Sequence, residues 1–407
     1  MRTVAIIGGG PAGAGCALTM LREARERGRQ LAVMLFEPKQ FGRHHNQCAG
    51  VVVQEDTQRL LARCGVQFPQ GLVQRTVSGY VLHARDQQIA LQPDEGGTLS
   101  VALRRVELDT HLLAEAASAG AEVLPDRVTD LEFGTRNVTI YTEGPTHRVD
   151  AVVGAFGLDA GAARILSRRT GYRPPPCIDT LVTKIHPGGL EPIAGLLEDQ
   201  IHAFLPRLPP IEFGALIPKG NHLSAIIAGV EIGIGDMERF LQVPQVAELL
   251  PADVPPGDCF RGAFPLGLAR RFCGPRHLIA GDAAGLVRPF KGGGINAALT
   301  TGRLAGLSLL DHGVGPGAAL AYLAACRELR SDVWYGRQLR RMVSLLSGPL
   351  RMEPIIDLAR RNPAMQRILH DCVSGRTTYR QIAHEQLSLR LLAQAGWACL
   401  TWPLRSR

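Results

Sequence analysis

The order of apolar and polar positions near the N-terminus predicts a strand, a glycine-rich turn, a helix and a second strand. Residues 3–8 (TVAIIG) form an apolar run typical of a buried strand, and residues 31–37 (LAVMLFE) form another. Between them, residues 16–28 carry apolar positions at helical spacing. The chain is therefore expected to begin with an α/β unit.

Further along, the pattern changes to short strands. Three apolar runs between residues 128 and 154 predict a meander of three strands that returns to the first sheet. Residues 79–84 (GYVLHA) and 99–104 (LSVALR) are expected to pair as a hairpin, and residues 165–265 mix short strands with proline-rich turns. We interpret this middle region as a second sheet.

The turn after the first strand has the spacing Gly8-x-Gly10-x-x-Gly13. Gly8 permits a tight turn, Gly10 lets the backbone approach a pyrophosphate, and Gly13 lets the helix pack close to the sheet. Glu37, at the end of the second strand, can accept hydrogen bonds from a ribose diol. Together these positions predict a dinucleotide-binding site.

A second glycine-rich stretch lies far downstream. Residues 277–285 (HLIAGDAAG) are expected to include a buried strand that ends at Gly281-Asp282, before a helix over residues 296–310. Asp282 can bind a hydroxylated chain such as ribityl. The glycines at 292–294 place backbone N–H groups at a helix start, which favours an electron-rich oxygen of a reduced flavin. No second GxGxxG is present, so one dinucleotide is held tightly and a nicotinamide has no domain of its own.

Length and composition indicate how many domains the chain can form and in which cellular compartment it is expected. The 407 residues suffice for two or three domains, and 45% hydrophobic with 20% charged residues is typical of a soluble globular protein. Nine cysteines are scattered without a CxxC pair, which favours a reducing compartment over a disulfide framework. The first residues lack a signal-peptide pattern, and no uninterrupted apolar run reaches 18 residues. We therefore expect a cytoplasmic protein without a spanning helix.

Positive charge gathers in the C-terminal part. Residues 314–407 contain 14 arginines and six acidic residues, which accounts for the whole formal net charge of +8, and they hold all three tryptophans. Basic charge with interfacial aromatic residues is one pattern of peripheral contact with an anionic membrane surface. The favoured interpretation is a set of solvated helices that pack on their own protein, with membrane contact as the alternative. No basic stripe accompanies a nucleic-acid reader motif, so nucleic acid is not expected as a partner.

These motifs resemble those of the geranylgeranyl reductase family of FAD-dependent oxidoreductases, a family with the aromatic hydroxylase fold. The likeness rests on GGGPAGAGCA at 8–17, CAG at 48–50, RVELD at 105–109 and GDAAGLVRPFKGGGINAA at 281–298. A short stretch at 374–382 (SGRTTYRQI) is similar to an element near the family's C-terminus.

The resemblance implies FAD as the cofactor, with Val128 touching the adenine through its backbone. The residues that it implies as FAD contacts are Gly8, Gly10, Pro11, Ala12, Gly13, Glu37, Arg105, Val128, Gly281, Asp282, Gly293, Gly294 and Ile295. The implied fold class is α/β, with a Rossmann-like FAD-binding domain, an inserted mixed or antiparallel β-sheet domain that binds substrate, and a helical C-terminal tail. The FAD-binding domain is expected to comprise residues 1–78, 100–160 and 264–312. The substrate-binding domain is expected at residues 79–99 and 161–263, and the C-terminal helical region at residues 313–407.

The chain departs from the family pattern at two places. Phe156-Gly157 stands where the class usually has Asp-Gly, with Asp159 two residues beyond the glycine. Because that acid is thought to help nicotinamide binding, reduction by NADPH or NADH is put in question and a ferredoxin becomes a more plausible electron donor. The aromatic strand YxWxFPxG is replaced by FGALIPKG at 213–220, in which Ala215 takes the place of tryptophan. The substrate pocket is therefore expected to be less bulky, and its substrate need not be geranylgeranyl.

The stretch HHNQCAGVV at 44–52 offers a candidate catalytic group. A zinc site needs three or four ligands at regular spacing, and no second Cys/His pair is present, so no metal is expected. His44 and His45 are expected to be solvent-side loop residues. Ala49 and Gly50 suit close approach of the backbone to an isoalloxazine ring, and the resemblance also places Cys48 there. The Cys48 thiol either donates a proton near flavin N5 or is a small apolar filler.

The leading functional hypothesis is reduction of carbon–carbon double bonds in a hydrophobic, isoprenoid-type substrate by hydride transfer from flavin N5. A monooxygenase that hydroxylates or epoxidises an apolar substrate is the main alternative. A halogenase is less favoured because the tryptophans of the strand motif are missing. A non-catalytic flavoprotein that acts as a sensor or scaffold is the third hypothesis.

Overall fold

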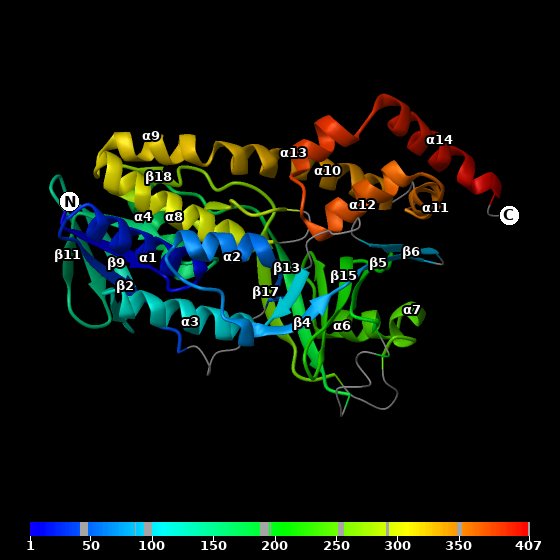
Figure 1. Ribbon diagram of the computed structural model, residues 1–407, viewed down its shortest axis with the longest axis horizontal. Helices are drawn as coiled ribbons and strands as arrows, with labels where there is room; N and C mark the ends of the chain where they lie inside the picture. The colour runs from blue at the N-terminus through cyan, green and yellow to red at the C-terminus, as the bar shows by residue number, and fades with distance from the viewer. Residues whose placement is uncertain are drawn as a thin grey trace.

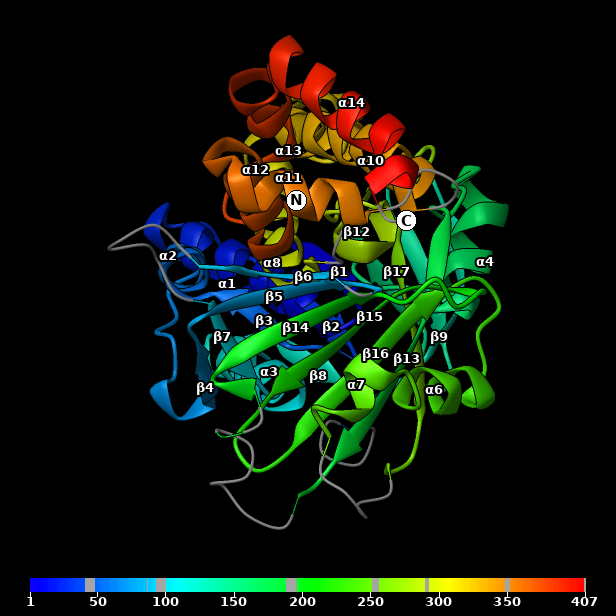
Figure 2. The ribbon, with the colours of Figure 1, turned by 90° about the vertical axis from the view of Figure 1, so that its right-hand side faces the viewer.

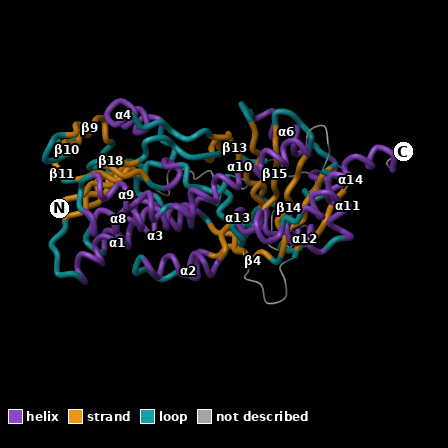
Figure 3. The backbone as a smooth tube through the Cα atoms, turned by 90° about the horizontal axis from the view of Figure 1, so that it is seen from above, coloured by secondary structure: helices purple, strands orange, loops and turns teal. Residues whose placement is uncertain are grey.

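The computed structural model describes residues 1–40, 48–85, 87–92, 100–187, 195, 197–250, 256–289, 293–347 and 352–405. The molecule is elongated, with one sheet near the N-terminal end and a second at the other end, where the C-terminal helices lie (Figures 1 and 3). The predicted α/β class is confirmed by this arrangement.

The first sheet has six strands in the order β18-β19-β12-β1-β2-β8. Its neighbouring strands run parallel, except β18 against β19. The strands are β1 (Thr3–Ile7), β2 (Ala32–Phe36), β8 (Glu122–Leu124), β12 (Ala151–Gly154), β18 (Cys273–Gly274) and β19 (His277–Ile279). The two apolar runs predicted near the N-terminus form neighbouring central strands, as buried parallel strands should.

Two helices that are far apart in the sequence pack closely beside this sheet. They are α1 (Pro11–Glu26) and α8 (Gly294–His312), with α3 (Arg105–Ser118) against α1 and α9 (Pro316–Ala325) against α8. A Cβ on Gly302 of α8 would lie 1.9 Å from the carbonyl oxygen of Ala12, so the two backbones almost touch. The helix predicted over residues 296–310 is confirmed. In the structure it begins at Gly294 and ends at His312, so it extends slightly beyond the prediction at both ends.

The second sheet has seven strands in the order β17-β13-β16-β15-β14-β5-β6. They are β5 (Gly79–Ala84), β6 (Gln87–Leu91), β13 (Cys177–Ile185), β14 (Gln200–Leu205), β15 (Ile211–Pro218), β16 (Leu223–Gly229) and β17 (Phe260–Pro265). Leu216 and Phe204 on one face pack with α6 (Ile234–Leu241) and α7 (Pro244–Ala247). Ile201 and Ile217 on the other face pack with the C-terminal helices.

The prediction that residues 79–84 and 99–104 pair as a hairpin is wrong. β5 pairs in antiparallel register with β6 and in parallel register with β14, whereas β7 (Ser100–Leu103) belongs to a separate three-stranded sheet, β3-β7-β4. The partners of β7 are β3 (Val51–Val53) and β4 (Val73–Val77). Both runs are apolar, and the pattern does not say which of several apolar runs each one meets.

The predicted meander is confirmed as the sheet β11-β10-β9, which leads into β12 of the first sheet. Its strands are β9 (Val128–Phe133), β10 (Val138–Thr142) and β11 (His147–Val149). The remaining elements of the first 180 residues are α2 (Gln54–Arg63), η1 (Gln70–Leu72) and α4 (Ala160–Thr170).

The C-terminal part is helical and covers one side of the second sheet (Figure 2). Its elements are α10 (Arg327–Ser347), α11 (Glu353–Arg361), α12 (Pro363–Ser374), α13 (Tyr379–Gln381), η3 (Ile382–Gln386) and α14 (Leu389–Arg405). None of the helices in the described part of the chain is long and apolar enough to cross a membrane.

Candidate active site

A cleft of about 450 Å³ opens at the carboxyl ends of the parallel strands of the first sheet, where open α/β sheets bind ligands. We call it the dinucleotide cleft. Many of the residues predicted from the sequence line it together, although they come from six separate segments. They are Gly8, Gly10, Pro11, Ala12, Glu37, Arg105, Val128, Gly281, Asp282 and Gly294.

The first glycine turn has no room for side chains. Gly8 has φ +105°, and a Cβ there would lie 2.4 Å from the carbonyl oxygen of Ala155. A Cβ on Gly13 would lie 1.8 Å from the carbonyl oxygen of Gly8. Gly13 therefore does not line the cleft but lets α1 begin against the turn, so that its first N–H groups face the cleft.

Glu37 is held in place at the end of β2. Its Oε2 accepts a hydrogen bond from Gly9 N at 2.8 Å, and its Oε1 accepts one from Lys39 N at 2.8 Å. The carboxylate is thus oriented by the backbone while each oxygen keeps a further lone pair. This arrangement fits a pair of ribose hydroxyl groups.

The charged residues of the cleft form a buried group around Arg105. Its Nε donates to Asp109 Oδ1 at 2.6 Å, and Asp109 is only 2% exposed. Burial raises the pKa of Asp282, and the charge of Arg105 opposes that rise. Arg105 lies at the first residue of α3 and lines the cleft, where its remaining N–H groups suit a phosphate.

Asp282 does not follow its strand directly, as the sequence led us to expect. β19 ends at Ile279, and residues 281–284 form the short helix η2. Gly281 takes φ +66° and its N–H donates to Thr301 Oγ1 at 2.9 Å, which ties this turn to α8. The correction moves the strand end by three residues and leaves Asp282 in the cleft.

The third glycine segment begins α8. Gly293 is the N-cap of the helix and Gly294 its first residue, and both line a second, larger cavity together with Ile295. The N-terminal N–H groups of α8 are therefore at the place where the two cavities adjoin. Gly292, the first of the predicted glycines, lies outside the described residues.

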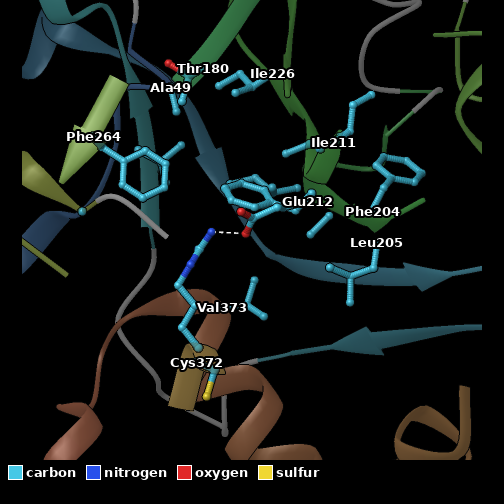
Figure 4. A pocket seen from close by; sticks show the side chains of 18 of the residues that line it. Ala49, Thr180, Phe204, Leu205, Ile211, Glu212, Ile226, Phe264, Cys372 and Val373 are labelled. Atoms are coloured by element: carbon cyan, nitrogen blue, oxygen red, sulfur yellow. Dashed lines mark hydrogen bonds and ion pairs between the residues drawn. The ribbon is translucent and has the colours of Figure 1, made fainter. Parts of the chain in front are cut away.

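The larger cavity, of about 1270 Å³, lies between the second sheet and the C-terminal helices. We call it the apolar cavity. Figure 4 shows Ile226 and Phe264 on one side of it and Cys372 and Val373 on another. Ala215 also lines it, so the residue that replaces the family's tryptophan does face this cavity. The residues that line both cavities are Lys39, Arg105, Phe156, Gly157, Asp159, Asp282 and Gly294.

One ion pair crosses the apolar cavity. The carboxylate of Glu212 on β15 binds the guanidinium of Arg340 on α10 (dashed line in Figure 4). A second arginine, Arg288, joins the segment after η2 to the C-terminal helices. It donates to the carbonyls of Gly375 and Thr377, and its guanidinium lies 4.4 Å from the ring centroid of Tyr379. The short element at 374–382 therefore fixes the helical layer to the dinucleotide-binding part.

Cys48, Ala49 and Gly50 line the apolar cavity rather than the dinucleotide cleft. The Sγ of Cys48 accepts a hydrogen bond from Gly50 N at 3.3 Å, and the side chain is partly exposed. The preceding histidines, His44 and His45, lie outside the described residues. Among the residues that the structure describes, no three His, Cys, Asp or Glu side chains gather as metal ligands.

Lys219 is a residue that the sequence reasoning missed. Its Nζ donates to the carbonyl of Ala49 at 2.5 Å and to that of Leu103 at 2.8 Å, and the residue is 3% exposed. Burial lowers the pKa of Lys219 from its ordinary 10.5 to about 8, while the nearby Cys48 opposes this. A lysine at the end of an apolar strand, between Pro218 and Gly220, was the available signal.

Asp159 has another use in the structure. It is the N-cap of α4, where its Oδ1 accepts from Ala162 N at 2.8 Å, and its Oδ2 lies 3.6 Å from Arg127. Phe156 and Gly157, in place of the family's Asp-Gly, line both cavities. An aromatic ring thus stands where the class usually has an acid.

Curated relatives of this chain are archaeal reductases. It is 28% identical over 224 residues to digeranylgeranylglycerophospholipid reductase 2 of Methanothermobacter thermautotrophicus, covering 50% of this chain and 53% of the relative. It is 26% identical over 381 residues to digeranylgeranylglycerophospholipid reductase of Methanothrix thermoacetophila, covering 86% and 88%. The first match thus spans about half of that relative's length. No family model matches the chain.

Solved structures share the fold at low identity. A geranylgeranyl bacteriochlorophyll reductase-like protein of Thermoplasma acidophilum has a TM-score of 0.70 and 18% identity, covering 97% of this chain and 96% of that one. The halogenase PltM, in complex with phloroglucinol and FAD, has a TM-score of 0.66 and 12% identity, covering 100% and 93%.

Proposed function

We propose that this chain, which is similar to curated lipid reductases and shares the fold of a geranylgeranyl bacteriochlorophyll reductase-like protein, is a geranylgeranyl reductase-like FAD-dependent oxidoreductase. We propose further that it reduces carbon–carbon double bonds in a long, apolar, isoprenoid-type substrate. The observation that carries the proposal is the apolar cavity of about 1270 Å³ that adjoins the dinucleotide cleft. A cavity of this size with mostly hydrophobic walls suits a large apolar ligand. The names of the curated relatives are those of lipid reductases, which supports the same substrate class.

The residues present fit an FAD molecule. The tight turn at Gly8 and the oriented carboxylate of Glu37 suit the adenosine end, and Arg105 suits the pyrophosphate. Asp282 and the start of α8 at Gly294 suit the flavin end, where the cleft meets the apolar cavity. When bound and reduced by the electron donor, the flavin would supply a hydride to one carbon of the alkene and would itself be reoxidised.

The second carbon of the alkene needs a proton, and we propose Cys48 as its donor. The thiol lines the apolar cavity and its Sγ is held by Gly50 N at 3.3 Å. Ala49 and Gly50 line the same wall and have no large side chains, which leaves the cavity beside the thiol open to a ligand. The largely apolar walls would hold the double bond beside the thiol, which is how placement contributes to the rate.

The electron donor follows from what replaces the family's acid. Phe156 has no carboxylate at that place, and the Oδ1 of Asp159, two residues beyond Gly157, is used to cap α4. We propose that the donor, NADPH, NADH or a ferredoxin, acts transiently from outside rather than in a site of its own. Reduction of the bound flavin by each donor in turn, followed at its visible absorption band, identifies it.

Anaerobic turnover tests the proposed reaction. The purified yellow protein is reduced chemically without oxygen and incubated with polyprenyl alkenes of increasing length. We expect a saturated product and reoxidised flavin, with longer chains preferred. Strict dependence on oxygen, or no product with any alkene while the flavin is reducible, would overturn the reductase function.

A monooxygenase is the second candidate. It is favoured by the likeness of the fold to PltM, a flavin-containing halogenase. In that case, the same incubation gives no product without oxygen and an oxygenated product after air is admitted.

A further inference from the structure

The exposed side of α14 is apolar along its length. The exposed fractions of Leu389, Trp397 and Leu400 are 87%, 66% and 71%. With Ala393 and Gly396 between them, these positions follow one another at helical spacing and lie on one face of the helix. Ala393 and Gly396 are also exposed on that face, and residues 391–404 contain no charged side chain. A surface helix normally turns polar residues outward, so this face lacks its partner.

The opposite side of the same helix is packed. Leu391 and Cys399 are buried in the core that joins α14 and α11 to the second sheet. Leu392 and Ala395 line the apolar cavity. The helix thus forms part of the cavity wall and at the same time presents an apolar face outward. In Figures 1 and 2 it lies at the outer edge of the helical layer.

We propose that this face of α14, with Leu389, Trp397 and Leu400, docks on the surface of a bilayer that contains anionic lipid. This inference rests on the proposed function in one respect: it takes the substrate to be an apolar molecule that is dissolved in the bilayer. An apolar substrate stored in the bilayer would reach the cavity along α14 without crossing water. The helix is too short and too firmly packed on α11 to span, so it lies in the interface.

Charge selects a bilayer over a second copy of the chain. Residues 314–407 carry 14 arginines and six acidic residues, and α14 has Arg390 and Arg405 near its ends and no acid. Two copies that met through this face would bring like charges together, which is unfavourable. An anionic lipid surface instead attracts each basic residue and accepts the apolar side chains.

The test compares the full-length flavin-containing protein with two variants. The double variant Trp397→Glu/Leu400→Glu places two acidic side chains on the apolar face of α14. The control variant Leu320→Glu places one acidic side chain on α9, at a leucine that is 67% exposed. Each is sedimented with vesicles of phosphatidylcholine alone or mixed with phosphatidylglycerol. We expect the wild type and the control to bind the mixed vesicles at low salt, and the double variant to bind at least tenfold less. Binding should weaken as salt is raised.

Flavin content and oligomeric state complete the test. A variant with the same flavin absorbance as the wild type is folded. If the double variant is not folded, the single variant Leu389→Glu replaces it in the test. Turnover of a short, water-soluble alkene should be unchanged in the variants, whereas turnover of a long substrate in vesicles should fall. No binding of the wild type to mixed vesicles overturns the inference, as does a wild-type dimer that the double variant makes monomeric. Vesicle binding without any alkene reduction overturns only the proposed function.

Discussion

At the scale of single residues, the buried ammonium group of Lys219 joins two backbone segments in the wall of the apolar cavity. Lys219 joins the carbonyl of Ala49 to that of Leu103, and a side chain at Gly50 would lie 2.2 Å from the latter. Burying an ammonium group costs free energy that its hydrogen bonds must offset. We therefore expect Lys219 to position the turn that carries Cys48.

Substitution of Lys219 by methionine removes both hydrogen bonds, so that each of the two carbonyls loses a donor. We expect turnover to fall by about tenfold or more and Lys219→Arg to recover part of it. Because the pKa of Lys219 is about 8, wild-type turnover should fall as the pH rises through that value. A profile of turnover against pH checks this, and the ionisation should vanish in Lys219→Met. An unchanged profile would restrict Lys219 to a packing role.

The same pKa has a consequence for stability. The group binds its proton more weakly in the folded chain than in the unfolded one, since its pKa falls from 10.5 to about 8. Its contribution is therefore least favourable below pH 8 and improves as the pH rises from there towards 10.5.

Cys48→Ser keeps the size of the side chain and replaces the thiol by a weaker acid. We expect FAD content to stay the same and turnover to fall by about tenfold or more, because the proton is delivered less readily. Flavin absorbance measures the first quantity and anaerobic product formation the second. Equal turnover would show that Cys48 only fills space.

For the elements, the close contact of α1 with α8 decides whether the dinucleotide cleft forms. The contact exists because Gly302 lets α8 reach the first turn of α1 at Ala12. That turn directs its N–H groups into the cleft, so a shift of α8 would move the phosphate site.

We expect Gly302→Ala to destabilise the protein by about 1–3 kcal/mol, because the backbone of α1 must move away from the new methyl group. FAD affinity should fall with it. Gly317→Ala on α9, where the added Cβ meets open space, is the matched control and should be neutral or slightly stabilising. Denaturant unfolding and FAD titration measure both effects. Equal results for the two variants would argue against this contact.

For the molecule as a whole, stability towards acid should depend on a histidine pair buried in the second sheet. His83 Nε2 and His202 Nδ1 are 2.9 Å apart, and His83 stacks on Phe204 with centroids 4.4 Å apart. Burial lowers the pKa of each histidine from 6.5 to about 4, and for His83 the charge of His202 adds to the effect. Both rings are therefore neutral in the folded protein at neutral pH.

The free energy of unfolding should consequently fall as the pH drops from 6.5 towards 4, because the unfolded chain takes up the protons first. We expect a loss of about 2 kcal/mol over this interval. In His83→Leu/His202→Leu the slope should be shallower, whereas His312→Leu, at an exposed helix end, should keep it. Urea unfolding at several pH values gives the slope, and equal slopes in the wild type and the double variant would contradict the assignment.

Local sequence was sufficient where one segment forms a complete unit. The turn from Gly8 to Gly13 and the carboxylate of Glu37 lie within one strand–helix–strand stretch, so spacing alone indicated how they meet. The segment around Asp282 was found because strand, glycine and acid are again adjacent, although the strand ends three residues earlier than expected. The FAD-dependent family was inferred from these same residues.

The remaining features depend on contacts between distant segments, and for these the local pattern is the same in several folds. β5 pairs with β14, more than a hundred residues away, and no property of GYVLHA distinguishes that partner from residues 99–104. Lys219 and Ala49, likewise, are 170 residues apart until their strands fold together. The apolar cavity has walls from both the second sheet and the C-terminal helices, because each surface has apolar side chains to bury and the three-dimensional packing brings them face to face.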